Sequence, residues 1–145
     1  MISKLKYKLL NMFREFLVYN SGSLEFRAEL MTLMMMSDCQ IDECEENLIQ
    51  EIACEIYNED TSRANILAEA IHEYHAKIIA PNGLSYNDLV AKIASDVKRT
   101  PRFTNKIDIV QLSRFRVCLE DEEEQIFHDR VISFLQDLKD EYGEL

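Results

Sequence analysis

A run of acidic side chains at residues 38–46 offers the clearest chemistry in this sequence. Asp38, Asp42, Glu45 and Glu46 all fall within it. Carboxylate oxygens are the ligands that hard divalent cations prefer. Several carboxylates so close together repel one another unless a cation binds among them and neutralises their charge. We therefore predict that these four residues form a divalent-cation site, with calcium, magnesium or manganese as the ion.

Helix capping explains part of the same cluster. Asp42 followed three residues later by Glu45 has the pattern of a capping box, and acids in the first turn of a helix favour its dipole. Capping leaves Asp38 unexplained, because this residue precedes the cap. Capping alone and capping combined with cation binding both remain open. The loop is not a calcium hand, since Glu43 and Ile49 stand where that motif needs Gly and Glu.

An enzymatic alternative starts from Glu69 and His72. Glu-x-x-His on a helix is the half-site of carboxylate-bridged di-iron bundles, because the three-residue step puts both groups on one face. A second copy is missing, since Gln125 stands three residues before His128. A metal-dependent oxidoreductase using Glu69 and His72 is therefore the alternative, and a non-catalytic binding module is the main prediction.

The elements that must position these residues are predicted to be helices. The chain has 145 residues with only three glycines and two prolines, which fits one compact all-α domain over residues 1–145. Apolar residues recur at helical spacing, which predicts six to eight helices. Their expected positions are about residues 2–19, 24–37, 42–57, 61–80, 85–99, 106–119 and 122–141. We expect the two helices that flank Asp38 to pack as an antiparallel pair.

The first predicted helix, within residues 1–20, is a basic amphipath. Its apolar stripe lies opposite Lys4, Lys6, Lys8 and Arg14. Such a helix suits an anionic membrane surface, but globular helices that pack onto a bundle have the same pattern. Membrane-surface contact and packing onto the domain both remain open.

The charge of the chain is strongly negative and unevenly spread. The formal net charge of −11 argues against nucleic acid as a partner and favours basic protein partners or cations. Acids dominate residues 37–60 and 120–145, whereas bases dominate residues 98–116. This segregation is typical either of acidic and basic faces that neutralise each other or of an exposed basic patch that binds a partner.

The four cysteines, Cys39, Cys44, Cys54 and Cys118, contain no C-x-x-C pair, and no secretory segment opens the chain. These features predict reduced thiols in a cytoplasmic protein, without structural zinc.

The stretch from Met36 to Glu45 resembles the TerB-like tellurite-resistance family. In that family an apolar helix ends in Ala-Asp-Gly, Val or Ile follows two residues later, and a Glu about seven residues after the Asp opens the next helix. The match puts Asp38 and Glu45 on the family's acidic positions, while Cys39 replaces the usual Gly.

The resemblance implies an all-helical fold of two related halves, with residues 120–124 in the place of the second acidic motif. It also implies a small cytoplasmic bacterial protein of stress response or tellurite resistance that binds metal or assembles with protein partners, and not a known catalyst. The oligomeric state is not indicated.

Overall fold

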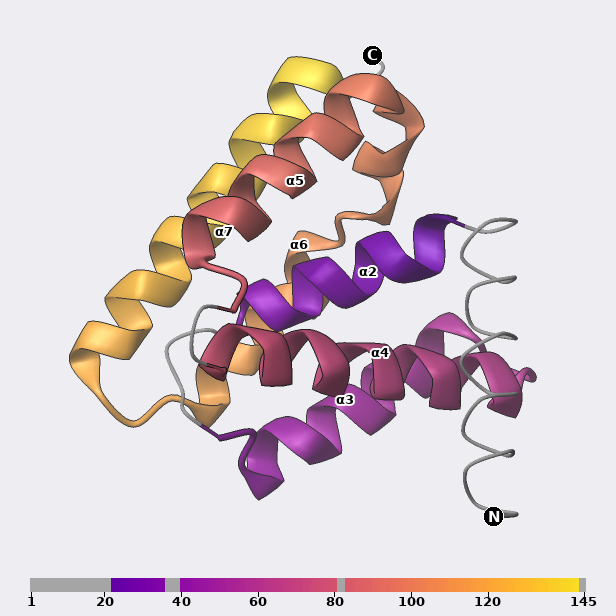
Figure 1. Cartoon of the computed structure of the whole chain (residues 1–145), viewed down its shortest axis with the longest axis vertical. Coiled ribbons are helices and arrows are strands. Elements are labelled where there is room, and N and C mark those ends of the chain that lie inside the picture. The colour runs from indigo at the N-terminus through magenta and orange to yellow at the C-terminus, as the bar shows by residue number, and fades with distance from the viewer. Residues whose placement is uncertain (1–21, 36–39, 81–82, 144–145) are drawn as a thin grey trace.

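Helices make up all the regular secondary structure in the described part of the chain (Figure 1). The computed structural model describes residues 22–35, 40–80 and 83–143. Its α-helices are α2 (Gly22–Leu33), α3 (Glu43–Ile56), α4 (Thr61–Ile79), α5 (Tyr86–Arg99), α6 (Ile109–Ser113) and α7 (Glu122–Tyr142), and its 3₁₀-helices are η1 (Pro101–Lys106) and η2 (Arg114–Cys118). The predicted all-α class is confirmed. The predicted helix at residues 2–19 and the residue Asp38 lie outside the described residues.

The helix α2 forms the centre of the packing. Almost every side chain from Leu24 to Leu33 is buried or nearly so, because this segment is apolar on most of its faces and needs neighbours all round. Helix α4 packs against it most extensively, α5 covers another side, and α5 and α7 lie side by side (Figure 1). The expected antiparallel pairing of α2 with α3 is wrong, because each of these two helices packs mainly against α4.

Local capping chemistry sets the helix starts. Ser85 and Asp88 form the predicted capping box, in which the Ser85 hydroxyl accepts from the Asp88 amide and the Asp88 carboxylate accepts from the Ser85 amide. The Asp60 carboxylate caps α4 by accepting from the Arg63 amide at 3.0 Å. Helix α5 ends at Arg99, as expected for a helix closed by a following proline.

The predicted sixth helix at residues 106–119 corresponds to two adjoining helices, α6 and η2, which together span residues 109–118. The Asp108 carboxylate accepts from the Gln111 amide, so a new helix starts only after Asp108. The Ser113 hydroxyl donates to the Ile109 carbonyl at 2.7 Å, and the chain then tightens into the 3₁₀-helix η2. Helix η2 lies alongside α3.

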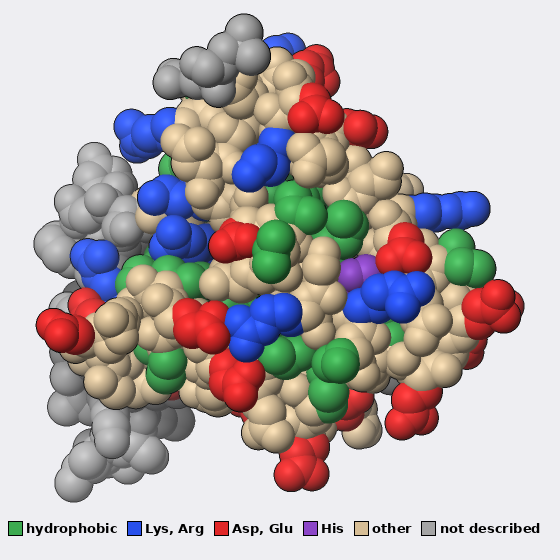
Figure 2. Space-filling model, turned by 180° about the vertical axis from the view of Figure 1, so that it is seen from behind, with side chains coloured by type: hydrophobic (Ala, Val, Ile, Leu, Met, Phe, Trp, Pro, Cys, Tyr) green, Lys and Arg blue, Asp and Glu red, His purple; other side chains and the backbone are tan. Residues whose placement is uncertain are grey.

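Much of the basic segment is used in internal ion pairs. Arg99 pairs with Asp96 within α5, Arg114 pairs with two acids of α3, and Arg116 donates two hydrogen bonds to Asp129 of α7, which lower the pKa of that carboxyl. Lys and Arg side chains also lie beside Asp and Glu on the face in Figure 2. This favours neutralising faces over a partner-binding basic patch. No helix in the described ranges is long and apolar enough to cross a membrane.

Candidate metal centre

Asp42 begins α3 and forms the predicted capping box. Its Oδ1 accepts from the Glu45 amide at 2.8 Å, and Glu45 Oε1 accepts from the Asp42 amide at 3.1 Å. The capping prediction is therefore confirmed. No described residue donates a hydrogen bond to Asp42 Oδ2, and Asp42 is exposed. One oxygen of this carboxylate stays available for a ligand.

The other two described acids of the predicted cation site, Glu45 and Glu46, make different contacts. Glu45 is 1% exposed and its carboxylate serves the cap. Glu46 Oε2 lies 2.6 Å from His72 Nε2 of α4, and Glu46 Oε1 accepts from Gln50. The structure thus brings Asp42 and Glu45 together through the cap, and it turns Glu46 toward α4. Cation binding by these acids with Asp38 stays a prediction.

A disulfide joins Cys44 to Cys118 beside this cap. Cys44 lies in the first turn of α3, Cys118 ends η2, and their Cα atoms are 5.6 Å apart although 74 residues separate them in sequence. The expectation that all cysteines are reduced is wrong for this pair. It relied on short-range spacing, which cannot detect two cysteines that only the tertiary fold brings together. Cys54 is a free, exposed thiol.

Asp42, Cys44 and Cys118 form a group of potential metal ligands. One potential ligand atom from each of these residues lies within 4.8 Å of the other two. Among the described residues, no other group of three or more His, Cys, Asp or Glu side chains is this close together. Two sulfurs and one carboxylate oxygen suit a borderline ion such as zinc, which binds sulfur, nitrogen and oxygen in tetrahedral geometry. They suit calcium and magnesium poorly, because those ions require oxygen ligands.

The two cysteines are held together by more than their bond. Arg114, at the start of η2, donates to Glu55 at 2.6 Å and to Glu51 at 3.1 Å, both on α3. These hydrogen bonds raise the pKa of Arg114. Phe115 of η2 is 1% exposed and belongs to the same core as Ile52 of α3. Polar and apolar contacts therefore fix η2 against α3 independently of the disulfide.

Comparison with known proteins identifies no similar protein. No family model, curated protein or solved structure matches this chain. The resemblance to TerB-like proteins therefore stays a prediction from residues 36–45.

Glu69 and His72 of the enzymatic alternative lie on the exposed side of α4. His72 is 47% exposed in its side chain and pairs with Glu46 of α3. The ion pair of His72 with Glu46 links α4 to α3 at the surface. Glu69 and His72 therefore do not face the bundle interior, where the ligands of di-iron proteins lie.

A second cluster of ionisable residues, which the sequence reasoning missed, lies between α2, α4 and α5. Glu29 is 1% exposed, and its Oε1 accepts from Lys92 of α5 and, at 3.5 Å, from the Tyr74 hydroxyl of α4. Tyr74 also donates to Glu25 at 2.7 Å, and Lys92 to Asp96 at 3.2 Å. Burial raises the pKa of Glu29 to about 7, although the Lys92 ammonium opposes this.

Glu29 stands on an apolar helix, which gave one signal for its burial. No signal in the sequence identified its partners, because they come from two other helices. Among described residues Glu29 Oε2 has no hydrogen-bond partner. The cluster links three helices.

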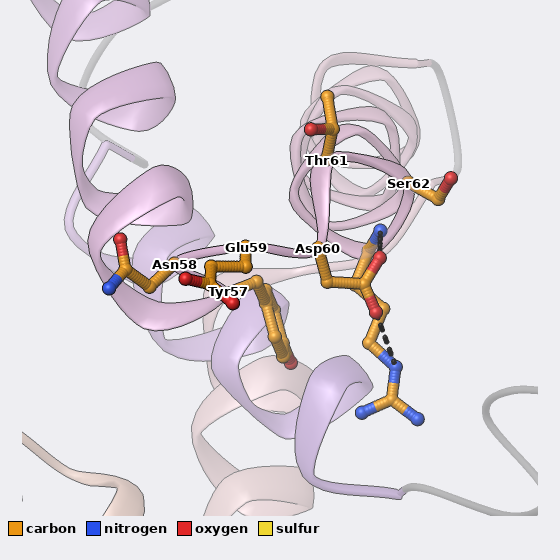
Figure 3. A pocket seen from close by; sticks show the side chains of 7 residues that line it. Tyr57, Asn58, Glu59, Asp60, Thr61 and Ser62 are labelled. Atoms are coloured by element: carbon orange, nitrogen blue, oxygen red, sulfur yellow. Dashed lines mark hydrogen bonds and ion pairs between the residues drawn. The ribbon is translucent and has the colours of Figure 1, made fainter.

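An open hollow of about 620 Å³ lies at the turn between α3 and α4 and is lined by residues 57–63 (Figure 3). The Asp60 carboxylate is already engaged there, by the Arg63 amide and by the Arg63 guanidinium at 3.6 Å. The hollow is formed by a single turn of the chain and presents no group of ligand atoms, so it is a weaker candidate than the start of α3.

Proposed function

We propose that this chain is a non-catalytic binding module, similar to TerB-like proteins, that takes up a divalent cation at the start of α3. The observation that carries the proposal is the group formed by Asp42, Cys44 and Cys118, whose ligand atoms lie within 4.8 Å of one another. The free Oδ2 of Asp42 gives the site its carboxylate ligand. Protein partners, stress response and a cytoplasmic location stay predictions from the resemblance.

The ligand set favours zinc over the calcium, magnesium or manganese expected from the acids alone. Sulfur ligands select borderline and soft ions, whereas magnesium and calcium need several oxygens. Asp38 lies outside the described residues, and a contribution from it stays a prediction. The oxidoreductase alternative with Glu69 and His72 has less support, because His72 is exposed and already paired.

Cation binding is tested by thermal melting of the reduced protein with zinc, calcium, magnesium or manganese. A cation that binds only the folded state raises the melting temperature, and at a given concentration the rise is larger for a cation that binds more tightly. We expect zinc to give the largest rise, and we expect Asp42→Asn to reduce it. Asn is a good helix N-cap, so this substitution removes the charged ligand and keeps the capping hydrogen bond.

Asp60→Asn is the matched control. Asp60 also caps a helix with its carboxylate, but no cysteine among the described residues forms a ligand group with it, so its substitution should leave the zinc effect unchanged. The proposal fails if none of the four cations raises the melting temperature at millimolar concentration. It fails equally if Asp42→Asn and Asp60→Asn behave alike.

A further inference from the structure

We propose that Cys44 and Cys118 are a thiol switch for this site: as two thiolates they bind zinc together with Asp42, and as a disulfide they release it. The inference rests on the proposed cation binding at the start of α3 and names both the ion and the control of its uptake. Three observations carry it. They are the ligand group itself, the disulfide within it, and the packing of η2 on α3.

The two states exclude each other for a geometric reason. Two sulfurs that share a tetrahedral zinc ion lie about 3.8 Å apart, whereas two sulfurs in a disulfide lie about 2.05 Å apart. The negative charge that makes each thiolate a strong zinc ligand is also lost when the disulfide forms. The pair therefore holds either the ion or the bond.

The reduced pair is placed to bind an ion without large rearrangement. Arg114 joins η2 to Glu51 and Glu55 of α3, and Phe115 is buried in the core, so we expect both cysteine backbones to stay close together when the disulfide is broken. Cys44 is exposed, which gives its side chain room to rotate until the two sulfurs reach the wider spacing. Asp42 supplies the third ligand of the tetrahedral site.

The redox step balances with a low-molecular-weight disulfide, such as glutathione disulfide, as the oxidant. Two thiolates of the protein lose two electrons as the sulfur–sulfur bond forms. The oxidant gains them as its own disulfide breaks to give two thiolates, and Zn²⁺ leaves unchanged. A dithiol reductant reverses the step and restores the ligands.

The experiment uses the full chain with Cys39→Ser and Cys54→Ser, so that Cys44 and Cys118 are its only cysteines. Zinc affinity is measured by competition with a chromogenic chelator, first for the reduced protein and then after oxidation by glutathione disulfide. We expect one zinc ion per chain in the reduced state and an affinity at least about tenfold lower in the oxidised state. Bound zinc should also slow formation of the disulfide.

A second variant, Cys118→Ser, removes one sulfur and cannot form the bond, and far-UV circular dichroism checks that it keeps its helices. We expect its zinc affinity to fall and to be insensitive to glutathione disulfide. Equal zinc affinity in the reduced and oxidised states, or full affinity in Cys118→Ser, overturns the switch while a cation site that depends on Asp42 still stands. Absence of binding by any cation in either state overturns the switch and the proposed function together.

Discussion

The substitution Glu29→Gln tests the buried cluster between α2, α4 and α5 through the pH dependence of stability. Glu29 is 1% exposed, and burial raises its pKa from 4.5 to about 7. Between these two values the folded chain keeps a proton that the unfolded chain has released. The stabilising contribution of the protonated carboxyl is therefore complete below pH 4.5 and is lost as the pH rises through about 7.

The magnitude follows from the separation of the two pKa values. Each pH unit between them is worth about 1.4 kcal/mol, so the whole effect is about 3 kcal/mol, of which about 2.5 kcal/mol falls between pH 5 and pH 8. Gln has nearly the same shape and does not ionise. The free energy of unfolding of the wild type, minus that of Glu29→Gln, should therefore fall by about 2.5 kcal/mol as the pH rises across this range.

Urea denaturation of the oxidised protein at several pH values measures this difference, in which titrating groups that do not interact with Glu29 cancel. Glu69→Gln, at an exposed position on α4, controls for the general effect of removing one negative charge. A wild-type minus Glu29→Gln difference that stays constant with pH, or that rises, would refute the reasoning that burial governs this carboxyl.

The remaining predictions concern the start of α3. Reducing the disulfide between Cys44 and Cys118, which are 74 residues apart, should lower the free energy of unfolding by up to about 4 kcal/mol in urea denaturation, and a loss below about 1 kcal/mol would contradict the role of loop closure. Arg114→Gln should weaken zinc binding by the reduced protein several-fold in chelator competition, because η2 loses its two hydrogen bonds to α3; unchanged affinity would show that the core alone holds η2. If Asp38 contributes a ligand, Asp38→Asn should abolish the rise in melting temperature caused by saturating cation and leave the cation-free protein nearly unchanged. Asp42→Ala should cost about 1 kcal/mol of stability with or without cation, because it removes the N-cap; no loss in the cation-free protein would contradict the capping geometry.

Features encoded over a few residues were predictable from the sequence. The capping boxes of Asp42 with Glu45 and of Ser85 with Asp88 depend on side chains three positions apart, and both are present. The end of α5 at Arg99 was also predictable, because the proline that closes this helix is only two residues away. The sixth helix starts at Ile109 and not near residue 106, because the Asp108 cap fixes its start, and the pattern gave no sign that it becomes a 3₁₀-helix at Arg114.

Features that the tertiary fold creates were not predictable. Cys44 and Cys118 are close together because η2 packs against α3, and the local spacing of the cysteines does not indicate that contact. The acids of residues 38–46 suggested an oxygen site, whereas the described part of the structure places the Cys44–Cys118 disulfide beside Asp42. Cation binding at Asp42, with acids or with sulfurs as the other ligands, stays a prediction.

X-ray absorption at the zinc edge of the reduced, zinc-loaded protein tests the central claim most directly, because it reports which atoms surround the ion. Zinc bound by Asp42, Cys44 and Cys118 should show two sulfur ligands at about 2.3 Å, with the remaining ligands oxygen at about 2.0 Å. Cys118→Ser should remove one of the two sulfurs. A shell of oxygen and nitrogen alone, or one that is unchanged in Cys118→Ser, would contradict the assignment of this site.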